Sequence, residues 1–217
     1  AQPANTWMYF QVTVPEGAKG WEVRLRDVLG QTPSAYVRRD LLPDGNGIML
    51  DEFRSLNHWG SGSAVSFQSY LLGKNIPPRM IAGMGGPLEP GTYYVGVWNS
   101  SETPVSYTVD SRGIGQNQVY PIADVAYVGG DATIADLPAG EVRYFRVVVP
   151  PGVASWELEL NVSKGEMGMM IRNGGVPLAT HLGPGGLDTL LSQNLIIKTG
   201  PERYVLLPSA GSTLIGG

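Results

Sequence analysis

The sequence contains no cysteine and only two histidines, His58 and His181. Without cysteine the chain has no disulfide bond, no thiolate metal site and no cysteine nucleophile. The lack of cysteine does not exclude secretion, because a protein can be exported without disulfides. The two histidines are far apart in the sequence, so we expect no zinc or transition-metal site built on paired histidine ligands.

Basic residues are also few. The chain has 15 lysines and arginines against 19 acidic residues, which gives a formal net charge of −4. Proteins that bind nucleic acids through the phosphates need a basic surface. The nearest candidates, Arg24, Arg26, Arg38 and Arg39, alternate with apolar residues as on the outer face of strands. The composition therefore predicts no nucleic-acid partner.

Long hydrophobic runs and long amphipathic helical patterns are absent. No apolar run approaches the roughly 20 residues that a helix needs to cross a bilayer, so we expect no membrane span. Glycine (30 residues) and proline (17 residues) are instead abundant. Such residues, spread between apolar runs, predict many short strands joined by turns.

The strongest signal is an internal repeat. The segment YFQVTVPEG at 9–17 returns as YFRVVVPPG at 144–152. With the same spacing, WEVRL at 21–25 returns as WELEL at 156–160. Shifted by one residue, YVR at 36–38 matches MIR at 170–172. The changes preserve the polar and apolar pattern, which indicates two homologous domains.

The repeated segments alternate with a period of two, which is typical of half-buried strands. Trp21 and Trp156 occupy the same position of an apolar stripe, so we expect both to be buried, with Glu22, Arg24 and the equivalent residues pointing to solvent. The other inward-facing residues expected from the alternation are Phe10, Val12, Val14, Val23, Leu25, Phe145, Val147, Val149, Leu158 and Leu160.

The fold class predicted from this pattern is all-β, with two tandem antiparallel β-sandwich domains of jelly-roll-like type. The glycine-containing stretch at 111–117 sets the boundary, which gives domains 1–115 and 116–217, the second incomplete at its C-terminal end. Further strands are expected at Ala64–Leu72, Tyr93–Trp98, Ser106–Val109, Val125–Val128, Ala132–Ile134, Met169–Arg172, Leu190–Ile197 and Tyr204–Leu207.

The repeat resembles the bacterial pre-peptidase C-terminal (PPC) domain family. The resemblance rests on the openings at Tyr9 and Tyr144, the strand Leu88–Val97 and the closing Ser106–Val109. The resemblance implies compact β-sandwich modules attached to secreted bacterial enzymes or large surface proteins. It also implies accessory roles rather than catalysis, with collagen, polysaccharide or calcium bound by some members. The sequence departs from the family in two respects. The acidic calcium ligands have no counterpart that can be placed, and the second unit has no Gly-Thr-Tyr-Tyr strand of its own.

The residues that catalysis would need are not arranged for it. No Gly-x-Ser-x-Gly nucleophile motif accompanies either histidine. Paired carboxylates of a glycosidase could be sought at Asp51-Glu52 or at Glu157 and Glu159, but these occupy turn or outward strand positions. The glycine-rich segments 83–86 and 183–186 lack the following helix that a phosphate loop requires. We therefore expect the chain not to be an enzyme.

One oxygen-rich loop has the spacing of a calcium site. Asp40, Asp44, Asn46 and Asp51 supply the hard oxygen ligands that calcium takes, although Gly45 and Gly47 do not fit an EF-hand. An ordinary solvated turn explains the same residues, and we favour it. The sequence thus predicts no cofactor, with calcium as the alternative.

Three exposed aromatic residues are candidates for ligand binding. On the strand at Tyr93, alternation leaves Tyr94 and Trp98 on the outer face around Gly96, a flat apolar strip on which a sugar ring can stack. Trp59 lies in a loop and is a second candidate. The alternative, which we favour, is that Trp98 packs on a neighbouring domain or on the turn at 99–104.

These observations predict a non-catalytic accessory, adhesion or spacer module of a larger secreted bacterial protein that sits outside the cell or at its surface. Its partners would be polysaccharide or an extracellular protein polymer, held weakly, and neighbouring repeats or chains that supply missing strands near Tyr204–Leu207. A carbohydrate-binding module that uses exposed aromatic residues, and a hydrolase fragment, are the two alternatives.

Overall fold

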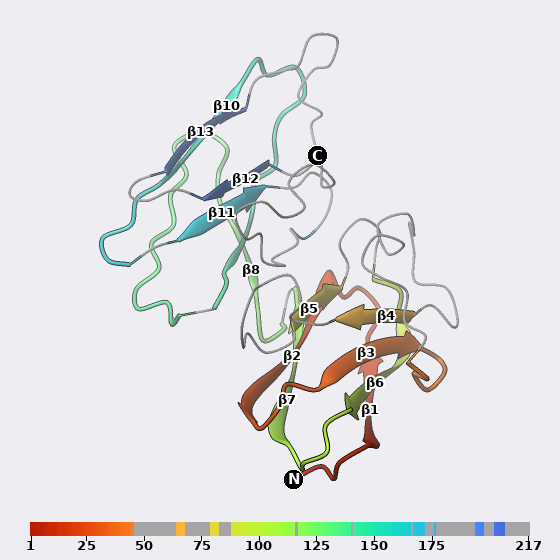
Figure 1. Ribbon diagram of the computed structural model, residues 1–217. Coiled ribbons are helices and arrows are strands. Elements are labelled where there is room, and N and C mark those ends of the chain that lie inside the picture. Colours follow the sequence, from red (N-terminus) through yellow and green to blue (C-terminus); the bar gives the residue numbers. More distant parts are fainter. Residues whose placement is uncertain are drawn as a thin grey trace. The chain divides into compact units, whose positions relative to one another are not determined.

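The computed structural model shows an all-β protein with no helix among its described residues (Figure 1). None of the described residues therefore forms a long apolar helix that could cross a membrane. The chain divides into two compact units, residues 1–121 with 178–190 (unit 1) and residues 122–177 with 191–217 (unit 2). The structure describes residues 1–45, 64–67, 79–82, 88–115, 117–139, 141–165, 167–171, 176, 194–197 and 202–206.

The described residues of unit 1 form two antiparallel sheets. A four-stranded sheet has the order β1-β6-β3-β4, and a three-stranded sheet has the order β5-β2-β7. Figure 1 shows β1 beside β6, and the two strands pair along their whole length. The strands are β1 (Thr6–Val14), β2 (Gly20–Leu29), β3 (Ser34–Arg39), β4 (Ala64–Phe67), β5 (Arg79–Ala82), β6 (Gly91–Asn99) and β7 (Ser106–Ile114).

The core of unit 1 lies between these two sheets, because each contributes the apolar side of its alternation. Trp21 of β2 is 3% exposed, and its indole meets the ring of Tyr93 of β6 edge-on at 5.5 Å. The indole nitrogen also donates a hydrogen bond to Ser111 Oγ at 2.9 Å. The inward positions predicted for the first repeat are confirmed; the buried residues of this core are Val14, Trp21, Val23, Leu25, Ala35, Val37, Leu88, Tyr93, Val95 and Val97.

In the Pro-x-Gly turns predicted after the repeated strand, the glycine has the same φ in both units. Gly17 and Gly152 each have φ of +78°, in the left-handed region that favours glycine. In unit 1 the turn is closed by the Ala18 N–H, which donates to the Pro15 carbonyl at 3.4 Å. The turn reverses the chain between β1 and β2, so the two strands enter different sheets.

The outward face of β2 differs from its prediction. Glu22 and Arg24 were expected in solvent, but they are 0% and 9% exposed. The register sets Glu22 opposite Arg112 of β7, and Arg24 opposite Asp110. Opposite charges on neighbouring strands can be buried together because each ion compensates its partner. The alternation therefore located the two faces of β2 correctly but not the burial of the charged one.

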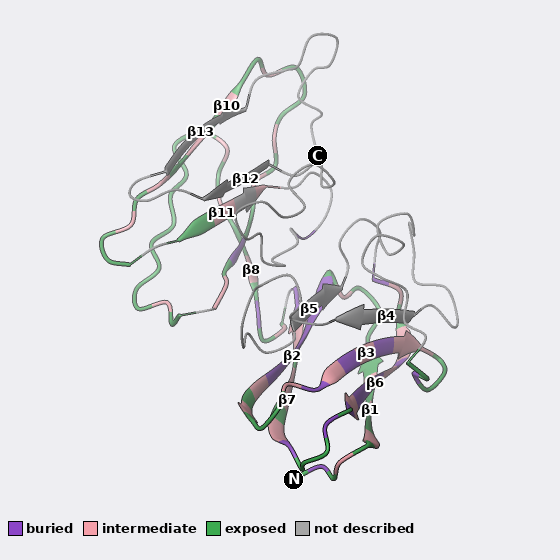
Figure 2. Ribbon diagram, viewed as in Figure 1, coloured by how far each residue is buried: buried purple, intermediate pink, exposed green. Residues whose placement is uncertain are grey.

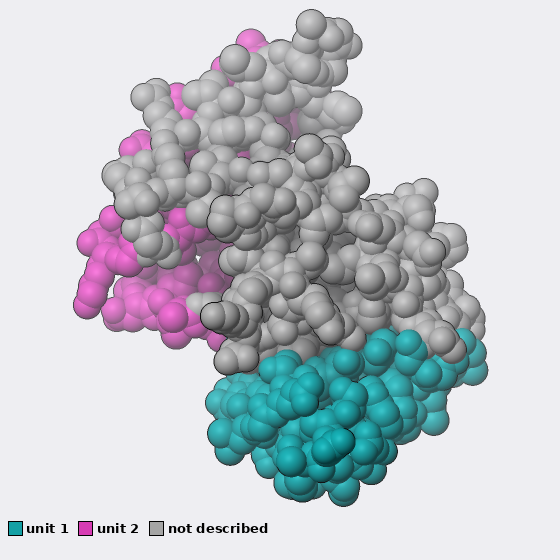
Figure 3. All heavy atoms as spheres, in the orientation of Figure 1, with its two compact units in different colours: residues 1–121, 178–190 teal, residues 122–177, 191–217 magenta. Residues whose placement is uncertain are grey.

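The described residues of unit 2 form three pairs of strands. β10 pairs with β13 and β11 pairs with β12, both antiparallel, while β8 pairs with β9 in parallel. Figure 3 distinguishes the two units by colour. The strands are β8 (Ile122–Asp124), β9 (Tyr144–Arg146), β10 (Trp156–Leu160), β11 (Gly168–Ile171), β12 (Asn194–Ile197) and β13 (Glu202–Leu206).

Two strands predicted at the start of unit 2, Val125–Val128 and Ala132–Ile134, are wrong. The strand lies just before them, and residues 127–129 form a turn in which Gly129 has φ of +64°. Val128 is 82% exposed and Ile134 is 44% exposed. These apolar residues do not form a buried stripe, so there is no hydrophobic face to stabilise a strand.

The apolar stripes of unit 2 are also less buried than predicted. Phe145 is 44% exposed while Tyr144 is buried, so β9 turns the opposite side inward from the one that the repeat predicts. Val147 and Val149 are half-buried. Trp156 is half-buried, unlike Trp21. Figure 2 shows buried stretches on β2 and β3, whereas β10 is coloured as intermediate and exposed. β9 pairs with β8 in parallel, whereas β1 pairs with β6 antiparallel, and a different pairing presents a different face.

Candidate functional site

Four aromatic side chains from three neighbouring strands meet on the outward side of the four-stranded sheet. The register sets Trp7 of β1 opposite Trp98 of β6. In the next row, Gly96 of β6 lies between Tyr9 of β1 and Tyr36 of β3. Successive side chains of a strand point to opposite faces, so these residues share the face that points away from the core. We call Trp7, Tyr9, Tyr36 and Trp98 the aromatic face.

Trp7 is the centre of the aromatic face. Its ring lies nearly parallel to that of Tyr9, with the centroids 5.6 Å apart and 5° between the planes. It contacts Trp98 at 5.4 Å with the planes tilted by 31°, and Tyr36 at 5.3 Å with a tilt of 51°. Offset and tilted contacts at these distances are favourable for aromatic pairs. The four rings therefore form one connected group.

Gly96 creates the space in which these rings meet. A Cβ atom at this position would lie 3.1 Å from Cζ3 of Trp7 and 3.2 Å from the ring carbons of Pro43. Trp7 and Pro43 therefore lie so close to the backbone of β6 that a side chain at this position would make them shift by a few tenths of an ångström. The Tyr9 hydroxyl donates a hydrogen bond to the Pro43 carbonyl at 3.2 Å. The segment after β3 is thus held against one side of the aromatic face.

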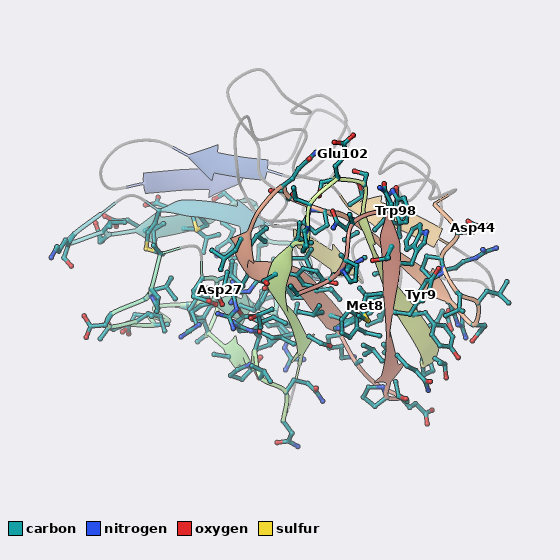
Figure 4. All side chains as sticks on the ribbon, turned by 60° about the horizontal axis from the view of Figure 1, so that its bottom comes forward. Met8, Tyr9, Asp27, Asp44, Trp98 and Glu102 are labelled. Atoms are coloured by element: carbon teal, nitrogen blue, oxygen red, sulfur yellow. The ribbon has the colours of Figure 1, made fainter. Side chains whose placement is uncertain are left out.

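Solvent still reaches this surface. Tyr9 is 39% exposed, and Trp7, Tyr36 and Trp98 are half-buried. Figure 4 shows Tyr9 and Met8 on opposite sides of β1, with Trp98 and Asp44 also in view. The adjoining segment adds apolar surface, because Leu41 is 50% exposed and Leu42 is 51% exposed.

The candidate strip predicted from the sequence is corrected by this geometry. Tyr94 and Trp98 do lie on the outward side of β6, but the strip at Gly96 is not open, since Trp7 and Pro43 cover it. Tyr94 is half-buried and lies one row further along the sheet. Trp98 packs on Trp7 of β1, a partner that the alternation of β6 alone did not indicate.

Trp7 was missed because the outward stripe was followed only from Tyr9 onward. Trp7 lies two residues before Tyr9, so it continues the same alternation toward the N-terminus. The third aromatic candidate, Trp59, lies outside the described residues.

The predicted calcium ligands are only partly described. Asn46 and Asp51 lie outside the described residues. Asp44 faces Arg38, with a distance of 3.4 Å between Oδ2 and the guanidinium, and Asp40 faces Arg39 at 3.7 Å. Each carboxylate thus has a separate basic neighbour. Among the residues that the structure describes, no three acidic or histidine side chains gather in the manner of metal ligands.

The charged residues on the outward side of β2 and β7 form a second group, which we call the Asp110 cluster. Asp110 accepts hydrogen bonds from Arg24 at 3.2 Å, from Arg112 at 2.8 Å and from two nitrogens of Arg26. Arg24 also contacts Glu22 at 3.3 Å. The side chain of Asp110 is 16% exposed. One carboxylate thus joins three guanidinium groups across two strands.

The Asp110 cluster lowers the pKa of its central carboxyl group. The hydrogen bond from Arg26, with smaller contributions from Arg24 and Arg112, lowers the pKa of Asp110 to about 2 from the usual 3.8, although burial opposes the shift. Asp110 is therefore ionised throughout the neutral range and is suited to a structural role rather than to donating a proton. The histidines His58 and His181 and the pair Asp51-Glu52 lie outside the described residues, whereas Glu157 and Glu159 are exposed as predicted.

Comparisons with known proteins return nothing for this chain: no family model, no curated protein and no solved structure matches it.

Proposed function

We propose that this protein is a non-catalytic accessory or adhesion module of a larger secreted bacterial protein, and that it binds an extracellular polysaccharide through the aromatic face. The observation that supports the proposal is the group of four contacting rings on the outward side of one sheet. Sugar rings stack on aromatic surfaces through their apolar C–H faces, so a connected aromatic surface suits a chain of sugars. The internal repeat and the PPC-like opening agree with a tandem β-sandwich module.

The proposal predicts that removing exposed rings weakens retention on polysaccharide. Tyr9→Ala and Trp98→Ala are each expected to lower the affinity for insoluble polysaccharide about fivefold, since one stacking contact contributes about 1 kcal/mol. The measurement is a depletion assay against cellulose, chitin and xylan, with calcium and with a chelator. Phe145→Ala is the matched control, because Phe145 is 44% exposed but belongs to unit 2.

The parent chain and both variants could be retained equally while having the same melting temperature. That result would refute polysaccharide binding by the aromatic face. An equal loss in Phe145→Ala would also refute it, because binding would then not depend on the aromatic face. If retention requires calcium, the loop that contains Asp40 and Asp44 becomes the candidate binding site in place of the aromatic face.

A proline-rich protein polymer is the second candidate ligand, and the contacts of Pro43 favour it. The Pro43 ring packs over Gly96 beside Trp7 while the Tyr9 hydroxyl donates to the Pro43 carbonyl. Aromatic grooves hold polyproline segments in this manner. Tyr9→Phe separates the two ligands: it keeps the ring that a sugar needs and removes the hydroxyl, so only binding to collagen or polyproline should weaken.

A further inference from the structure

The acceptor sequence for N-linked glycans, Asn-x-Ser or Asn-x-Thr with x other than proline, occurs twice in the chain. One copy is Asn99-Ser100-Ser101, which begins at the last residue of β6. The other is Asn161-Val162-Ser163, which follows β10 directly. A glycan is bulky and polar, so an enzyme can attach it only to an asparagine that lies at the surface. The structure distinguishes the two copies on this point.

The copy at Asn99 is closed. Asn99 is 1% exposed, and its amide nitrogen donates hydrogen bonds to the carbonyls of Pro3 at 3.0 Å and Thr103 at 2.9 Å. The hydroxyl of Ser101 donates to the side-chain oxygen of Asn99 at 2.7 Å. The nitrogen that would carry a glycan and the hydroxyl that an enzyme would recognise are therefore both engaged inside the fold.

The copy at Asn161 is accessible. From β10 into the segment after it, half-buried residues alternate with exposed ones, as expected when successive side chains point to opposite sides. The half-buried residues are Trp156, Leu158, Leu160 and Val162, and the exposed residues are Glu157, Glu159, Asn161 and Ser163. The asparagine and the serine of the acceptor sequence thus lie on the same exposed side.

The repeat shows how this segment differs from its counterpart. The spacing that relates Trp21 to Trp156 also relates Arg26 to Asn161. Arg26 is inside β2, where it lies opposite Thr108 of β7 and donates a hydrogen bond to Asp110. β10 instead ends at Leu160, one residue before Asn161. Unit 2 therefore has an accessible segment where unit 1 has a paired strand.

The space around the segment is also open. Gly165 has φ of +88°, and a Cβ atom built there would have no atom of the described residues within 4 Å. Lys164 is exposed as well. The chain after Ser163 thus turns in solvent, which leaves room for an enzyme and for the attached glycan.

An acidic residue lies on the same side of the chain. Glu159, two positions before Asn161, is exposed, whereas the residue two positions before Asn99 is Val97, which is 0% exposed. A carboxylate can accept a charge-assisted hydrogen bond, which is stronger and more directional than a neutral one. An enzyme that binds this side of the chain therefore meets a carboxylate, an amide and a hydroxyl at alternate positions.

We propose that Asn161 is an N-glycosylation site, and that an oligosaccharyl transferase recognises it through Glu159 and Ser163. The co-substrate is an oligosaccharide joined to a lipid through a diphosphate. Nδ2 of Asn161 forms a bond to the anomeric carbon of the first sugar, and the bond from that carbon to the diphosphate oxygen breaks. The lipid diphosphate leaves with the electron pair, and the amide gives up one proton. The proposal rests on the proposed function only for export, because acceptor sequences of this kind are used in secreted chains.

The test incubates the purified full-length chain with a bacterial oligosaccharyl transferase and a lipid-diphosphate-linked oligosaccharide, and follows the intact mass. The parent chain is expected to gain the mass of one oligosaccharide. Asn161→Gln, which still contains the copy at Asn99, and Ser163→Ala should gain none. Ser163→Thr keeps the hydroxyl and should be modified. Glu159→Gln should be modified about tenfold more slowly, because a hydrogen bond to a charged group is lost.

Several outcomes would overturn the proposal. The folded chain could stay unmodified while a peptide of residues 157–165 is modified, which would mean that the fold hides the site. If the peptide also stays unmodified, the sequence is not an acceptor. A glycan on the Asn161→Gln chain would assign the reaction to another residue, and an unchanged rate for Glu159→Gln would remove Glu159 from the recognised sequence. The mass measurement involves no polysaccharide binding, so failure of the proposed function at the aromatic face would leave it unaffected.

Discussion

Replacing Trp21 with alanine is expected to lower the free energy of unfolding of unit 1 by about 3–5 kcal/mol. The indole is 3% exposed and lies between the two sheets, so its removal leaves a cavity that the surrounding strands can close only in part. The variant also loses the edge-on contact with Tyr93 and the hydrogen bond to Ser111. An alanine side chain makes neither the contact with Tyr93 nor the hydrogen bond to Ser111.

The repeat provides the matched variant for this experiment. Trp156→Ala removes the same side chain from the equivalent strand, where it is half-buried, so we expect a clearly smaller loss. From the repeat alone, both tryptophan side chains were expected to be buried. Urea unfolding followed by hydrogen exchange of each unit separates the two effects, because a chain of two units need not unfold in one step. Equal losses in the two variants would contradict the difference in burial.

Much of unit 1 could be predicted from its sequence because its strands alternate regularly. The inward residues of β1, β2 and β6 follow from the period of two, and a core between two sheets needs only those stripes. The alternation also identified the outward side of β6, where Trp98 lies. One of the four residues of the aromatic face, Trp98, could therefore be found from a single strand.

The rest of the site depends on which strands are neighbours, and a period of two does not reveal that. Trp7 meets Trp98 because β1 and β6 pair in one register, although the two residues are far apart in the sequence. The contact of Pro43 with Gly96 likewise depends on how the chain turns after β3. Local alternation sets the face of a side chain, whereas the register of the sheet sets its partners.

The burial of Glu22 and Arg24 was not predicted, because both residues are charged. A charged residue on an alternating strand usually lies in solvent, and both were assigned there. Their partners are on β7, so the burial depended on a pairing that the sequence does not display. In unit 2 the opposite error occurred: Phe145 is apolar and was expected to point inward, yet it is 44% exposed. Both errors arise because burial depends on the neighbouring strands as well as on the residue itself.

The Asp110 cluster leads to the second large effect. Asp110→Asn keeps the size of the side chain but removes the charge that compensates three arginines, of which Arg24 is 9% exposed. We expect a loss of about 3 kcal/mol in the free energy of unfolding, the lower end of the cost of removing one partner from a buried ion pair. Asp124→Asn is the control: Asp124 pairs with Arg146 through two hydrogen bonds, but both side chains are exposed. Such a pair contributes little to stability, so this variant should unfold like the parent.

The same cluster makes unit 1 sensitive to acid. The pKa of Asp110 is about 2 in the folded chain and close to 3.8 when unfolded, so the unfolded chain binds the proton more readily. The stabilisation from the ionised carboxylate is therefore complete at neutral pH and is lost as the pH falls from about 5 to about 2. In a series of urea titrations, the difference in stability between the parent and Asp110→Asn should be constant above this range and shrink within it. A difference that stays constant down to pH 2 would show that the three arginines do not stabilise the charge of Asp110.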